Sequence, residues 1–155
     1  MAENKLPELA YKIIKIHTSK FSCTELEDDN LTEQFNTPDL FRVGIASTLN
    51  VDKDKSTVTV DISTQLIKKE TDEVLIEHVG RTSYLVKGLL EVFDEERQEY
   101  DFPDVFLTQL YAIAYSHARA LLSIELSPTV YKDKYFIPVV NPASFFQNLK
   151  KEPKK

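Results

Sequence analysis

The sequence is short of the residues that build covalent, metal and phosphate sites. Its single cysteine, Cys23, has no internal disulfide partner, so we expect a reducing compartment. Its 3 glycines are scattered, which excludes a glycine-rich phosphate-binding loop. The 3 histidines lie far apart, without the spacing of zinc ligands. We therefore expect neither a metal nor a cofactor.

Long apolar runs and an excess of basic residues are also absent. No stretch approaches the roughly 18 apolar residues of a membrane span, and Met1 to Pro7 lacks the pattern of a secretory signal. We therefore expect a cytoplasmic protein without membrane insertion. The formal net charge is −6, and the basic end of the chain makes the rest still more acidic. Such a surface repels phosphate backbones, so we predict no nucleic-acid partner.

The length and composition predict a single domain. A chain of 155 residues with 42% hydrophobic residues can bury a core without disulfides or metals. We place this domain at residues 1–149. The lysine-rich residues 150–155 are then a basic, flexible tail.

Three segments alternate apolar and polar residues, as strands do when one face is buried. They are 41–51, 58–66 and 74–86, joined by short polar turns. Residues 9–21 fit a helix or a strand, and their β-branched residues favour a strand beyond residue 10. We predict a meander-like, four-stranded antiparallel sheet. Gly80, inside the third segment, predicts a bulge or a close backbone approach.

A long helix and a short one follow the strands. After Pro103, apolar residues recur every three or four positions, which predicts a helix of about twenty residues that ends at Ser127. Its expected apolar face is Phe106, Leu110, Ile113, Ala114, His117, Leu121 and Ile124. We predict an extended segment at residues 131–140 and a short lid helix at residues 143–149. Strands followed by helices predict an α+β fold with the helices on one side of the sheet.

No residues come together in a catalytic pattern. Ser116 and His117 are adjacent on a helix and diverge by about 100°, so they form no nucleophile–base pair. Glu77 and His78 lie on opposite faces of a strand. We therefore expect a protein that is not an enzyme. Small residues along the long helix permit close packing, either on its own sheet or on a second subunit.

Aromatic residues are plentiful, with 9 phenylalanines and 7 tyrosines. Phe145 and Phe146 are neighbours on the expected lid helix, so they cannot both face one core. One of them is available to a subunit interface or to a client protein, and the sequence leaves both options open.

Three motifs occur in an order that resembles the SecB family of ATP-independent bacterial chaperones. They are Val74-Leu75-Ile76-Glu77, then His117-Ala118-Arg119, then Val139-Val140-Asn141 followed by residues 142–146. The resemblance implies a four-stranded antiparallel sheet with helices on one side, assembled as a dimer of dimers. It also implies a chaperone that holds unfolded polypeptides in apolar grooves without a nucleotide.

The resemblance also assigns candidate site residues. The client groove would draw on Phe21, Tyr84, Tyr131, Tyr135, Phe136, Phe145 and Phe146. Leu75 and Glu77 would dock the export ATPase SecA. The segment from Thr18 to Ser22 lacks the two acids that the family uses for that docking. Protection of an antitoxin is then an alternative to export, and a non-catalytic adaptor for one folded partner is an alternative to a chaperone.

Overall fold

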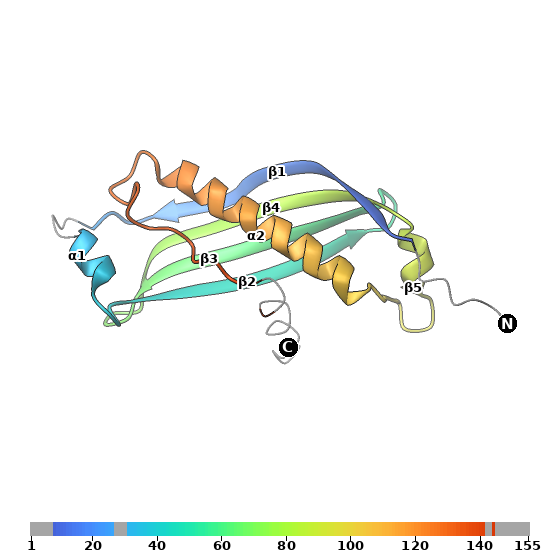
Figure 1. Ribbon diagram of the computed structural model, residues 1–155, viewed down its shortest axis with the longest axis horizontal. Coiled ribbons are helices and arrows are strands. Elements are labelled where there is room, and N and C mark those ends of the chain that lie inside the picture. The colour runs from blue at the N-terminus through green and yellow to red at the C-terminus, as the bar shows by residue number, and fades with distance from the viewer. Residues whose placement is uncertain (1–7, 27–30, 142–143, 145–155) are drawn as a thin grey trace.

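The computed structural model describes residues 8–26, 31–141 and 144. A four-stranded antiparallel sheet carries a long helix across one face (Figure 1). The strands are β1 (Ala10–Cys23), β2 (Phe41–Asp52), β3 (Thr57–Lys68) and β4 (Glu73–Lys87). The helices are α1 (Leu31–Asn36) and α2 (Asp104–Leu126). The predicted α+β fold is confirmed.

The strand order is β1-β4-β3-β2, which corrects the predicted meander. β2, β3 and β4 do form a meander of neighbouring antiparallel strands, because short turns join them. β1 pairs instead with β4, at the far edge from β2. The long acidic connection before β2 allows this crossing, and the result is a Greek-key order.

The two faces of the sheet differ in burial. We call the side that packs on α2 the helix face, and the other side the open face. On β3 the helix-face residues Val58, Val60, Ile62 and Leu66 are buried, whereas their neighbours on the open face are only partly covered. The alternation in the sequence therefore predicted correctly which residues of β3 share a face.

The buried face of α2 is rotated from the predicted one. Its buried residues are Phe106, Leu110, Ala114, Tyr115, Ala118, Leu122 and Leu126, whereas Ile124 is exposed. The helix lies close to β4 at Gly80, where an added Cβ would come within 2.9 Å of the Cβ of Ala118. Small residues therefore decide which side of α2 meets the sheet, and the predicted close approach at Gly80 is confirmed.

The connections hold more structure than the sequence indicated. Residues 89–103 contain a 3-10 helix, η1 (Leu89–Val92), and a hairpin of β5 (Phe93–Asp94) and β6 (Glu99–Tyr100). After α2 the chain turns back, and residues 135–140 run along α2 without regular secondary structure. Apart from Ser144, the predicted lid helix at 143–149 lies outside the described residues, as does the tail at 150–155.

Candidate functional site

An apolar row on β2 lies on the part of the helix face that α2 contacts least. α2 packs across β4, β3 and β1, and Figure 1 shows the first half of β2 away from the helix, whereas the start of α2 passes over the end of β2. The pairing of β2 with β3 places one row of β2 side chains on the helix face. These half-buried residues are Phe41, Val43, Ile45, Leu49 and Val51. We call the surface along this row the β2 groove.

A recess lies at each end of the β2 groove. The first has a volume of about 500 Å³, and its apolar wall is formed by Phe35, Phe41, Val43, Leu66, Tyr135 and Phe136. The second has a volume of about 360 Å³ and is lined by Leu49, Val51, Glu99, Tyr100, Phe102, Leu107 and Tyr111. Aromatic side chains line both recesses, so the groove offers large apolar contacts at either end.

Residues 135–140 form the wall between α2 and the groove. Figure 1 shows this segment, in red, running between α2 and β2. Two hydrogen bonds attach it to the helix: the Tyr115 hydroxyl donates to the carbonyl of Pro138, and Arg119 Nε donates to the carbonyl of Ile137 at 3.0 Å. Val139 remains 78% exposed and Phe136 56% exposed. The segment therefore presents apolar side chains to solvent beside the groove.

Phe35 is a site residue that the sequence analysis missed. Its ring lies 4.9 Å from that of Phe41, 6.1 Å from that of Tyr131 and 6.0 Å from that of Tyr135, measured between centroids. Phe35 comes from α1, inside the connection that we predicted to be acidic and polar. A single large aromatic residue in such a connection was the available signal.

The structure separates the seven predicted client residues. Tyr84 and Tyr131 are fully buried and Tyr135 is almost so, which corrects their expected exposure. Each of the first two has a hydroxyl partner inside the fold: Tyr84 donates to the carbonyl of Leu110 at 2.8 Å, and Tyr131 donates to that of Thr24. Burial raises the pKa of Tyr131 and that of Tyr135 to about 12. Tyr131 and Tyr135 lie beside Phe35, and Tyr135 lines the first recess.

The other predicted client residues lie in different places. Phe136 is exposed at the first recess, as described above. Phe21 is half-buried on the helix face of β1, where its ring packs against His78 at 6.4 Å between centroids. That position is at the opposite edge of the sheet from β2. Phe145 and Phe146 lie outside the described residues.

The predicted docking residues are not side by side on the surface. Leu75 is fully buried, so it cannot contact a docking partner without opening the core. Glu77 lies on the open face and forms an ion pair with Lys20 at 2.8 Å. Its docking role stays a prediction.

The comparisons with known proteins give structural matches of low sequence identity and no sequence-level match. A scan against protein-family models finds no match, and neither does a search of curated proteins. Among solved structures, one match is a SecB-like chaperone from Mycobacterium tuberculosis in complex with a peptide from an antitoxin. It is 13% identical over 84% of this chain and 88% of that chain, with a TM-score of 0.49. Another is a Streptococcus agalactiae protein of unknown function, 13% identical over 85% and 99%, with a TM-score of 0.44. Both TM-scores lie below 0.5, so neither match establishes what this chain is.

The three histidines do not meet. His78 is fully buried on the helix face and lies 3.0 Å from the hydroxyl of Thr18, whereas His117 contacts Thr82 at 2.9 Å. Burial lowers the pKa of both histidines.

In the part of the chain that the structure describes, no group of three or more His, Cys, Asp or Glu residues could hold a metal ion. Nor is any helix of that part both long and apolar enough to cross a membrane.

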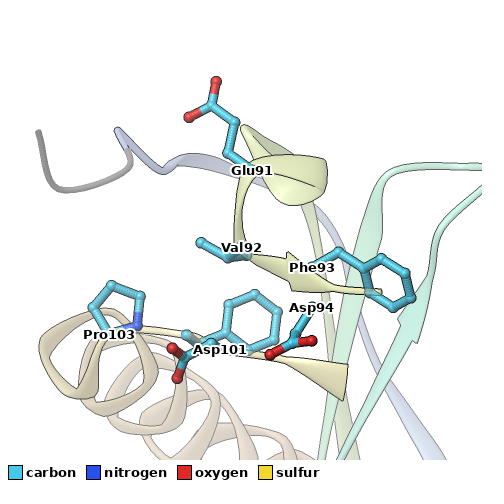
Figure 2. A pocket seen from close by; sticks show the side chains of 7 residues that line it. Glu91, Val92, Phe93, Asp94, Asp101 and Pro103 are labelled. Atoms are coloured by element: carbon cyan, nitrogen blue, oxygen red, sulfur yellow. The ribbon is translucent and has the colours of Figure 1, made fainter. Parts of the chain in front are cut away.

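A separate, acidic recess lies where the β5–β6 hairpin meets the start of α2 (Figure 2). Its volume is about 530 Å³, and its lining includes Glu91, Asp94 and Asp101. Figure 2 shows Glu91 projecting away from the other two acids. Asp94 accepts hydrogen bonds from the backbone and side chain of Arg97, and these lower its pKa. The carboxylate of Asp94 therefore stabilises the turn between β5 and β6.

Proposed function

We propose that the chain is an ATP-independent holding chaperone that binds unfolded polypeptides in the β2 groove. The observation that carries the proposal is the half-buried apolar row of β2, which ends in two aromatic recesses. The order of the SecB-like motifs in the sequence points to the same role.

The groove suits an extended client. Alternate residues of β2 line it. An extended client that lies along the strand has the same two-residue spacing, so every second side chain of the client would face the groove. Burial of about 1,000 Å² of apolar surface would provide roughly 25 kcal/mol before the cost of ordering the client is subtracted. That is enough to hold a client without a nucleotide.

The groove also has a charge preference. Glu99 lines the second recess, and the chain as a whole has a net charge of −6. In the first recess Asp39 is paired with Lys69, and Lys134 also forms part of the lining. Acidic flanks speed the capture of basic segments. The preferred clients are therefore unfolded segments that combine aromatic and basic residues, and their role in the cell is either protein export or protection of an antitoxin.

Self-association is part of the proposal. The outward side of α2 carries the exposed small residues Ser116 and Ala120, next to the half-buried Ala112. Small residues permit close helix packing, so a second copy could cover this side, in a dimer that pairs again into a tetramer.

The test replaces the two exposed apolar residues beside the groove. The double variant Phe136→Ser/Val139→Ser should suppress the aggregation of a chemically denatured, unrelated protein several-fold less well than the wild type, with no nucleotide present. A matched control is Leu90→Ser/Val105→Ser, which removes two similarly exposed apolar residues that line neither recess. The control should retain wild-type suppression.

The same assay distinguishes the alternative function. If the folded wild type does not suppress aggregation at near-stoichiometric amounts, the chaperone proposal fails. An adaptor for one folded partner then becomes the better account. If both double variants lose suppression equally, general stickiness explains the effect and the β2 groove does not.

A further inference from the structure

His78 is a titratable side chain that lies fully buried between α2 and the sheet. It belongs to the helix face of β4, two residues before Gly80, and has no exposed surface. A Cβ added at Gly80 would lie 3.4 Å from Cε1 of His78 and 2.9 Å from Cβ of Ala118. The imidazole ring is therefore next to the close contact between α2 and β4.

One ring nitrogen of His78 has no hydrogen-bond partner among the described residues. Nε2 lies 3.0 Å from the hydroxyl of Thr18, whereas Nδ1 has no partner. Thr64, opposite His78 on β3, is also buried, and its hydroxyl has no partner there either. The neutral tautomer with its proton on Nε2 suits this site, because it donates to Thr18 and leaves Nδ1 without a proton. An imidazolium would bury a second N–H that no described residue accepts.

The charged group that acts on His78 is Glu125 of α2. The residues that face the ring from the neighbouring strands carry no charge: Thr18 and Phe21 on β1, and Thr64 on β3. Burial lowers the pKa of His78, and the attraction of Glu125 opposes this effect without cancelling it. A charged His78 is therefore unfavourable while α2 covers it.

Departure of α2 from the sheet would free His78 from this constraint. In water the imidazole has its ordinary pKa of about 6.5, so an uncovered ring takes up a proton below that pH. Because the pKa is lower in the covered state, the stability that a neutral His78 gives to this contact is complete above about pH 6.5 and is lost as the pH falls from there toward the lowered pKa. Each pH unit in that range favours the uncovered state by up to about tenfold.

We propose that His78 makes the contact between α2 and the sheet sensitive to pH, so that protonation of its ring in mildly acidic solution releases α2 from β4. Release exposes apolar side chains that are otherwise buried, such as Leu122 of α2 and Ile62 of β3. The segment 135–140 is hydrogen-bonded to α2 and moves with it. A gain in client capture also follows, and this consequence rests on the chaperone function proposed above.

Hydrogen exchange tests the release of α2 without any client. Wild-type protein is compared at about pH 7.5 and about pH 5.5, one unit on either side of the ordinary pKa of histidine. After correction for the intrinsic pH dependence of exchange, amides of α2 should lose protection by up to about tenfold at the lower pH, while those of β3 keep theirs. In His78→Gln the protection of α2 should be the same at both pH values. The glutamine amide can still donate to Thr18, so this variant keeps the hydrogen bond and removes the titration.

The other two histidines provide matched controls. His17→Gln removes a histidine from the open face, on the side of the sheet away from α2, and should leave the acid response of α2 unchanged. His117→Gln removes a half-buried histidine of α2 that contacts Thr82, and should retain most of the response. Loss of the response in His117→Gln but not in His78→Gln would overturn the proposal. So would an equal loss of protection in α2 and β3, because it would show that the whole fold opens.

An NMR titration of the histidine ring protons tests the proposal even if His78→Gln does not fold. The chain has 3 histidines, so the signal that persists in both His17→Gln and His117→Gln belongs to His78. This signal should titrate below the ordinary value of about 6.5. Glu125→Gln removes the opposing attraction and should move the midpoint to still lower pH. A midpoint for His78 at or above the ordinary value would contradict the proposal.

The link to clients is measured separately. Wild-type protein should suppress the aggregation of a denatured protein several-fold better at about pH 5.5 than at about pH 7.5, and His78→Gln should suppress it equally at both. Release of α2 without a gain in capture would overturn the link to clients alone. An absence of suppression at both pH values would contradict the chaperone function, whereas the exchange and titration results would still decide the role of His78.

Discussion

Single residues decide how closely α2 approaches the sheet. Gly80 was recognisable from the sequence as a glycine inside a strand, and its neighbour in space is Ala118 of α2. The pairing of these two residues was not predictable, because it depends on the rotation of α2 about its own axis. The sequence analysis placed Ala114 but not Ala118 on the apolar face of the helix, whereas the structure buries both.

Gly80→Ala should destabilise the fold by about 1–3 kcal/mol, because the new Cβ would lie 2.9 Å from the Cβ of Ala118 and 3.0 Å from its Cα. Gly44→Ala is the matched control, since the nearest atoms to a Cβ there are 3.9 Å away. It should leave stability unchanged or raise it by about 0.5–1 kcal/mol. Urea unfolding of both variants measures the difference, and equal effects would contradict the close packing of α2 at Gly80.

The exposure of individual aromatic residues also could not be predicted from the sequence. Tyr84 and Tyr131 look like surface aromatics in a one-dimensional pattern, yet both are buried with hydroxyl partners more than twenty residues away. Such partners are fixed only when the sheet is assembled. Phe136 is 56% exposed at the first recess, and its role in client binding stays a prediction.

At the scale of elements, local patterns predicted most of the structure. The alternating segments became β2, β3 and β4, and the periodic segment became α2. The ambiguous residues 9–21 form β1, as the β-branched residues indicated. The β5–β6 hairpin was missed because its strands have only two residues each, which is too short for a period to be visible.

The segment 135–140 depends on α2 for its position. Arg119→Ala removes the hydrogen bond to the carbonyl of Ile137, worth about 1 kcal/mol. Hydrogen exchange in this segment should become about fivefold faster, while β3 and β4 remain protected. Arg42→Ala makes the same change on β2, where the arginine forms an exposed pair with Asp72, and should not affect the segment. Unchanged exchange in the Arg119 variant would show that Tyr115 alone holds it.

The whole molecule has two sheet edges with different chemistry. β2 offers a half-buried apolar row beside aromatic recesses, whereas β1 offers lysines on one face and isoleucines on the other. The sequence predicted the strands but not this arrangement, because the order β1-β4-β3-β2 is set by a crossing connection rather than by a local turn. The resemblance to SecB suggested a client groove, and we propose that the β2 edge provides it.

Site-specific cross-linking tests the β2 groove most directly. A photoreactive phenylalanine analogue at Leu49 lies on the helix face, and the same analogue at Thr48 lies on the opposite face of the same strand. With a denatured client and no nucleotide, the account predicts strong cross-links from position 49 and few from position 48. Equal cross-linking from both positions, or none from position 49 in a folded protein, would contradict the proposal that β2 holds the client.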